Sequence, residues 1–167
     1  MSITGVLSVA SALAAVVAVV LSVRQVRLMS RQSLLPVVLE AFREARSREW
    51  FDARDFIYER LAAECSPERG VSQQPPEARV ALRKVGFLFD NFGLLIAHGV
   101  VPEEVVIGFF GSLDEIWHIM EPYVRKEAEL RGMGYMVFFE DLVVRSRSRS
   151  TRDVRKALGL RTIGTVR

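Results

Sequence analysis

EARVALRKVGFLFDNFGLLIAH, residues 77–98, is the stretch that decides the fold of this chain. Its apolar side chains recur at spacings of three and four, which is the pattern of an amphipathic helix with one buried face. Gly99 follows, and glycine commonly ends a helix in the left-handed conformation. The pattern therefore predicts a long helix that stops at Gly99. His98, in the last turn, is expected to interact with free carbonyl groups rather than to bind a metal.

Further helices are expected on both sides of this segment, because the same spacing returns between typical start and stop residues. They are expected at residues 33–45, from 47 to the Pro-containing loop 66–76, and at 102–111, 112–131 and 136–144. No convincing strand-like alternation occurs between residues 33 and 144, and no Asn-Gly or Asp-Gly turn is present there. The sequence therefore predicts an all-α domain, a compact bundle of about five to six helices over residues 33–144.

The first 23 residues have a different composition. Residues 2–23 carry no charged side chain, and 16 of these 22 residues are Ile, Val, Leu or Ala. Since about 20 apolar helical residues cross a bilayer, we expect a transmembrane anchor at 1–23 and a juxtamembrane connector at 24–32. A cleaved signal peptide and a buried core helix are the alternatives. A signal peptide would begin with basic residues, and none are present here. Its one candidate cleavage triplet, residues 12–14, lies inside the apolar run.

Positive charge follows this apolar segment, and none precedes it. Arg24, Arg27 and Arg31 place the N-terminus outside and the remaining residues in the cytoplasm, as in a single-pass protein of the plasma membrane. The single cysteine, Cys65, agrees with a reducing compartment because it can form no internal disulfide. Small side chains recur every four residues in the predicted anchor, at Ala10, Ala14, Ala18 and Ser22. They form a face for a homodimer, or they only reflect how common alanine is in such spans.

The last 23 residues are strongly basic. Residues 145–167 carry eight basic residues and one acidic residue, whereas residues 24–144 carry 15 basic and 19 acidic residues. We expect a largely flexible tail with a short helix capped by Thr151. This tail either docks on an anionic lipid surface or stays solvated. Nucleic-acid binding by the tail is less favoured because the preceding domain is acidic. The candidate lipid contacts are Arg24, Arg27, Arg31, Arg145, Arg147, Arg149, Arg152, Arg155 and Lys156.

Motifs for catalysis or metal binding are absent from the sequence. Glu115 and His118 have the spacing of one half of a di-iron site, but no second pair exists. Cys65 has no cysteine partner at zinc-binding spacing, and no nucleophile elbow, phosphate loop or metalloprotease helix occurs. We therefore expect no metal, no cofactor and no enzymatic activity.

An unusual polar pair, Asp90 and Asn91, interrupts the apolar pattern of the longest helix. Buried polar groups need hydrogen-bond partners, so this pair is expected either to fix the packing or to line a small-ligand site. The candidate pocket combines residues from two predicted helices: Asp90, Asn91, Trp117 and Glu121.

Several short motifs follow one another between residues 85 and 142. They include Phe89-Asp90-Asn91, Gly93-Leu94-Leu95, Pro102-Glu103-Glu104, Phe109-Phe110-Gly111 and Glu121-Pro122-Tyr123. Their order resembles that in a family of small bacterial, actinobacterial-type proteins known as a domain of unknown function, and residues 36–61 are similar too. The resemblance implies one N-terminal span before a compact helical domain. It implies no catalytic residue, and it leaves the basic tail outside.

These observations lead to one main hypothesis and two alternatives. The chain is expected to be a single-pass membrane protein whose cytoplasmic helical domain binds a protein partner as a non-catalytic scaffold or regulator. The first alternative is a membrane-tethered small-ligand sensor or enzyme that uses the pocket near Asp90. The second is nucleic-acid binding through the basic tail.

Overall fold

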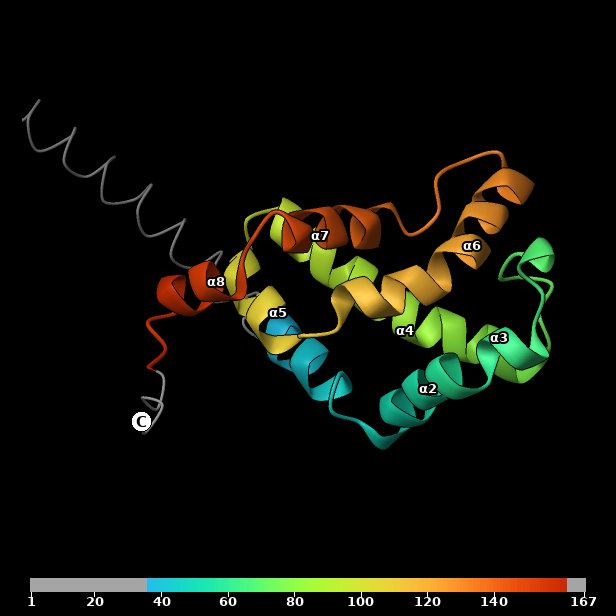
Figure 1. The fold of residues 1–167 in the computed structure, drawn as a ribbon, viewed down its shortest axis with the longest axis horizontal. Coiled ribbons are helices and arrows are strands. Elements are labelled where there is room, and N and C mark those ends of the chain that lie inside the picture. Colours follow the sequence, from blue (N-terminus) through green and yellow to red (C-terminus); the bar gives the residue numbers. More distant parts are fainter. Residues whose placement is uncertain (1–35, 162–167) are drawn as a thin grey trace, which may run out of the picture. The chain divides into compact units, whose positions relative to one another are not determined.

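The computed structural model describes residues 36–161, and these residues form helices and no strand (Figure 1). The all-α prediction is therefore confirmed for this range. The contacts described below lie within the second of the two compact units of the chain, which begins at Glu40. Residues 36–44 are helical, and the elements that follow are α2 (Arg48–Glu59), α3 (Leu61–Glu64), the 3-10 helix η1 (Pro67–Arg69), α4 (Pro76–Ala97), α5 (Glu103–Phe109), α6 (Leu113–Arg131), α7 (Val137–Arg147) and α8 (Thr151–Ala157).

The predicted membrane architecture needs correction. Among residues 36–161, no helix combines the length and the apolar character that crossing a bilayer requires. This finding overturns the prediction of a transmembrane helix and of a single-pass protein in the plasma membrane. Helix α4 has the length of a span, but it carries Arg79, Lys84 and Asp90, which a bilayer core disfavours. The predicted anchor, its dimer face and the three arginines of the connector lie outside the described residues.

Helix α4 is the central element of the bundle, and α2 and α7 both pack along it (Figure 1). Its buried side chains follow the predicted spacing of three and four, so the amphipathic pattern is confirmed. The helix ends as predicted, because Gly99 adopts a positive φ of 65° and its N–H donates to the Ile96 carbonyl over 2.9 Å. The residues of the α4 face that are buried include Leu82, Val85, Phe89, Phe92 and Ile96.

Glycine allows α4 and α7 to approach closely. A Cβ atom built on Gly93 would lie 2.6 Å from the Phe138 carbonyl carbon, and closer still to its oxygen. The Phe138 backbone at the start of α7 therefore lies directly against α4. Phe89 and Phe139 stack beside this contact with ring centroids 4.8 Å apart, and Trp117 of α6 meets Phe139 edge-on.

The loop before α4 is held by buried polar side chains. The Gln74 amide nitrogen donates to the carbonyl oxygens of Ser66 and Gly70 at 2.6 and 2.7 Å. The Tyr123 hydroxyl of α6 donates to the Cys65 carbonyl at 3.0 Å. These bonds satisfy backbone groups that the turn would otherwise leave unpaired, so the loop is an ordered part of the bundle.

Helical packing continues beyond the domain boundary that the sequence predicts at residue 144. Helix α7 runs to Arg147, and after a three-residue link α8 packs against α5. Ser150 caps α8, because its Oγ accepts the Asp153 N–H at 3.1 Å, and Val154 is buried. The short helix expected in the tail is present, but its cap is Ser150 and not the predicted Thr151, which is the first residue of the helix. This part of the tail belongs to the packed structure.

Candidate functional site

The four residues of the predicted pocket lie in different environments. Asp90 is half-buried, Asn91 is exposed, and Trp117 is buried among aromatic rings with only 2% of its surface accessible. Glu121 lies on the surface of α6 and forms an ion pair with Arg125 at 3.3 Å. None of the four lines the cavity described below.

Asp90 caps the start of α7 from the neighbouring helix. Its Oδ1 accepts the backbone N–H groups of Phe138 and Phe139 at 2.9 and 3.0 Å. Met136, at the cap position itself, adopts a left-handed conformation with φ of 52° and offers no capping side chain. Of the two roles expected for this residue, the contacts of Asp90 are those of a packing role.

Replacing Asp90 by alanine is expected to destabilise the bundle by about 1–2 kcal/mol, because two N–H groups at the start of α7 lose their acceptor. Asp90→Asn keeps an acceptor oxygen and should recover part of this loss. Urea unfolding followed by circular dichroism measures both changes. Asn91→Ala, on the exposed side of the same helix, is the control, and a loss as large as that of Asp90→Ala would contradict the capping role.

A cavity of about 640 Å³ lies where α8 and the end of α7 pack against α5. Gly108 permits this packing, since a Cβ atom there would lie 2.7 Å from Leu158 Cδ1 of the segment after α8. The lining combines apolar and charged side chains. It consists of Ile107, Gly108, Phe110, Gly111, Asp114, Ser146, Arg147, Arg149, Val154, Arg155 and Leu160.

Two of the three lining arginines are held in place by acidic residues. Arg147 Nε lies 2.6 Å from Asp114 Oδ1 at the start of α6. Arg149 pairs with Glu103 and, at 3.4 Å, with Glu104, both in the first turn of α5. These ion pairs fix the orientation of the guanidinium groups and neutralise much of their charge, although their exposure limits what they add to stability.

Arg145 completes this network from within α7. Its guanidinium donates to Asp141 at 2.6 Å and to Glu103 at 3.1 Å. The hydrogen bonds that Arg145 donates to these two carboxylates raise the pKa of Arg145 above its ordinary value. Glu103 therefore joins α5 to both α7 and the link before α8.

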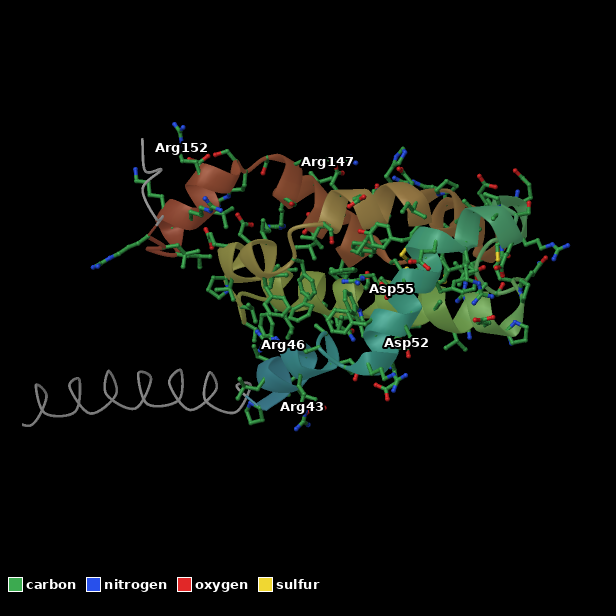
Figure 2. All side chains as sticks on the ribbon, turned by 60° about the horizontal axis from the view of Figure 1, so that its bottom comes forward. Arg43, Arg46, Asp52, Asp55, Arg147 and Arg152 are labelled. Atoms are coloured by element: carbon green, nitrogen blue, oxygen red, sulfur yellow. The ribbon has the colours of Figure 1, made fainter. Side chains whose placement is uncertain are left out.

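Arg155 is different, because among the described residues it forms no ion pair. It is exposed on α8, and it lines the cavity beside the apolar side chains of Ile107, Phe110 and Val154. Arg152 and Lys156 are exposed on the same helix but do not line the cavity; Figure 2 marks Arg152 on α8 and Arg147 at the end of α7. Within residues 36–161, the cavity thus offers one cation without an ion-pair partner, next to an apolar surface.

Such a lining can hold an acidic group and an apolar group side by side. Sequence reasoning identified the three arginines of the cavity but assigned them to lipid contact. It did not identify Ile107, Phe110 and Asp114 as lining residues. It used Glu103 and Glu104 only as part of a motif shared with a family. For metal ions, no suitable group of three His, Cys, Asp or Glu side chains occurs in residues 36–161.

Fold and site together define an all-α domain with an arginine-lined cavity at its C-terminal end. The chain belongs to the DUF4760 family, a domain of unknown function, whose family profile matches residues 9–146. This confirms the family part of the resemblance; it shows neither a bacterial origin nor a membrane anchor. Neither a curated protein nor a solved structure matches the chain. The profile ends at residue 146, so Arg147, Arg149 and Arg155 lie beyond it.

Proposed function

We propose that this chain is a non-catalytic binding module that holds an acidic, partly apolar segment of a partner protein in the α5–α7–α8 cavity. The observation that carries the proposal is Arg155, a cation without a carboxylate partner among the described residues, facing a cavity with an apolar wall. Guanidinium and apolar groups hold a ligand without forming or breaking its bonds.

The exposure of the lining favours a protein segment over a small molecule. Small-molecule sites commonly enclose 70–90% of the ligand surface. Here Arg147, Arg149, Arg155 and Leu160 are all exposed, with 57% of the Leu160 surface accessible. An occupant of this cavity therefore keeps one face in water, as a bound peptide segment does.

Charge favours an acidic segment. The paired arginines already have carboxylate partners from α5 and α6, and these show which chemical group the site accepts. A carboxylate of a partner would complete the same arrangement at Arg155. An apolar side chain next to it would cover Phe110 and Val154, which line the same cavity.

Charge reversal at Arg155 tests the proposal. Peptides selected from a random display library against the full chain are expected to combine Asp or Glu with large apolar residues. Arg155→Glu is expected to weaken their binding about tenfold or more, measured by fluorescence anisotropy, because it places like charges together. Arg152→Glu makes the same charge change on the same helix outside the lining, and it is expected to weaken binding less than about twofold.

Equal losses in the two variants would show attraction to a basic surface rather than binding in the cavity, and would contradict the proposal. Selected peptides without acidic residues would contradict it as well. Circular dichroism spectra of both variants should match that of the parent chain, since both side chains are exposed.

A further inference from the structure

We infer that Ser150 is a phosphorylation site and that its modification regulates the cavity through α8. The consequence for partner binding rests on the function proposed above, whereas the modification itself and its effect on α8 do not. Three features of the described chain carry the inference: the accessibility of Ser150, the arginines around it and the hydrogen bonds of its hydroxyl group.

Ser150 is accessible to an enzyme. It is exposed, and its backbone is extended, with φ of −76° and ψ of 150°, in the short link between α7 and α8. A protein kinase binds its acceptor segment in an extended conformation, so the link already has the backbone geometry that such an enzyme requires at the acceptor residue.

The surrounding charge selects the class of enzyme. Arg145, Arg147 and Arg149 precede Ser150 at every second position, and Arg152 follows it. A kinase with an acidic substrate groove is complementary to this pattern, and it must compete for the three preceding arginines with their carboxylate partners Asp141, Asp114 and Glu103. In the reaction, the Ser150 oxygen bonds to the γ-phosphorus of a nucleoside triphosphate and loses its proton to the base of the kinase. The bond from that phosphorus to the bridging oxygen breaks, and the nucleoside diphosphate leaves.

The hydroxyl group that receives the phosphate also holds the first turn of α8. Ser150 Oγ accepts the Asp153 N–H at 3.1 Å and donates its own proton to Asp153 Oδ2 at 2.6 Å. A phosphoserine has no proton to donate there, and its charge of about −1.5 to −2 repels the Asp153 carboxylate. Phosphorylation therefore removes the hydrogen bond to Asp153 Oδ2 and sets two anions against each other in the first turn of α8, which we expect to rearrange.

Rearrangement of α8 reaches the cavity directly. Val154 and Arg155, the next residues of this helix, are part of its lining. The phosphate also competes with Glu103 and Glu104 for the guanidinium group of Arg149, because all three are anions. Phosphorylation thus alters both the wall and the charge of the site.

The first test is incorporation of phosphate into the full chain by an arginine-directed kinase with ATP, located by mass spectrometry. A synthetic peptide with the sequence of residues 143–158 shows that the kinase is active. Ser150→Ala is expected to lower incorporation at least about fivefold, whereas Ser148→Ala, a serine of the same link, leaves it within about twofold. Phosphorylation of the peptide without the chain, or equal losses in the two variants, would overturn the inference.

The second test is hydrogen exchange of the backbone amides in α8. After phosphorylation, residues 153–158 are expected to exchange about fivefold faster, the fold-change that corresponds to loss of a helix cap. Unchanged exchange in the phosphorylated chain would refute the link to the cavity wall. Neither readout uses a partner peptide, so failure here is separate from failure of the Arg155→Glu experiment.

Discussion

Gly93→Ala is expected to lower the free energy of unfolding by about 2–3 kcal/mol, because the added methyl group meets backbone rather than a movable side chain. The new Cβ atom would lie 2.6 Å from the Phe138 carbonyl carbon and 3.0 Å from its Cβ atom. Helices α4 and α7 must then separate, which also strains the hydrogen bonds that Asp90 accepts from the first N–H groups of α7. This cost exceeds the gain of about 1 kcal/mol that alanine brings to a helix interior.

Two other glycines are matched controls for this variant. At Gly86 the added atom meets the flexible end of Met136, which can rotate away, so Gly86→Ala should lose less than Gly93→Ala. At Gly111 nothing lies within 4 Å, and Gly111→Ala is expected to be close to neutral. Urea unfolding curves of the three variants give the ranking. A Gly93→Ala midpoint at or above that of Gly111→Ala would contradict the close helix contact.

The local features of the fold were predictable from the sequence. The spacing of Leu82, Val85, Phe89 and Phe92 gave the buried face of α4, and Gly99 gave its end. The contact at Gly93 was not predictable, because the atoms that it meets belong to a residue 45 positions later in the chain. Helical periodicity describes one helix at a time and contains no information about which neighbour it meets.

The interpretation of the N-terminal segment rested on composition. An uncharged apolar run predicts insertion from length and charge alone, and no helix of residues 36–161 provides the span that the predicted architecture requires. The excess of arginine in the tail was likewise recognised, but composition cannot pair charges. Arg149 meets Glu103, 46 residues away, so much of the positive charge that suggested lipid contact is neutralised within the bundle.

Glu127 is the residue that the sequence analysis missed most clearly. It lies on α6 among other charged residues, yet only 1% of its surface is accessible. Its Oε2 accepts the N–H groups of Val71 and Ser72, both at 2.8 Å, and its Oε1 accepts Arg131 Nε at 2.6 Å. One carboxylate thus fastens the loop before α4 to α6, over a sequence separation of 56 residues for Val71.

Glu127→Gln is expected to cost about 3 kcal/mol at neutral pH. Burial raises the pKa of the Glu127 carboxyl, but hydrogen bonds from Ser72, Arg131 and Val71 lower it more, from an ordinary 4.5 to about 2. A pKa depressed on folding stabilises the folded chain above the unfolded pKa by about 1.4 kcal/mol per unit. This contribution is complete above about pH 5 and is lost as the pH falls toward about 2.

Unfolding free energies measured between neutral pH and about pH 2 test this expectation, because the difference between the parent chain and Glu127→Gln should shrink over that window. Glu129→Gln is the matched control, since Glu129 lies two residues further along α6, is exposed and, in the described part of the chain, pairs only with Lys126. Its loss is expected to stay below about 0.5 kcal/mol and to change little with pH. If the difference in unfolding free energy between the parent chain and Glu127→Gln stayed constant down to low pH, the amide would misfit the site sterically. The buried charge would then not be what holds the loop.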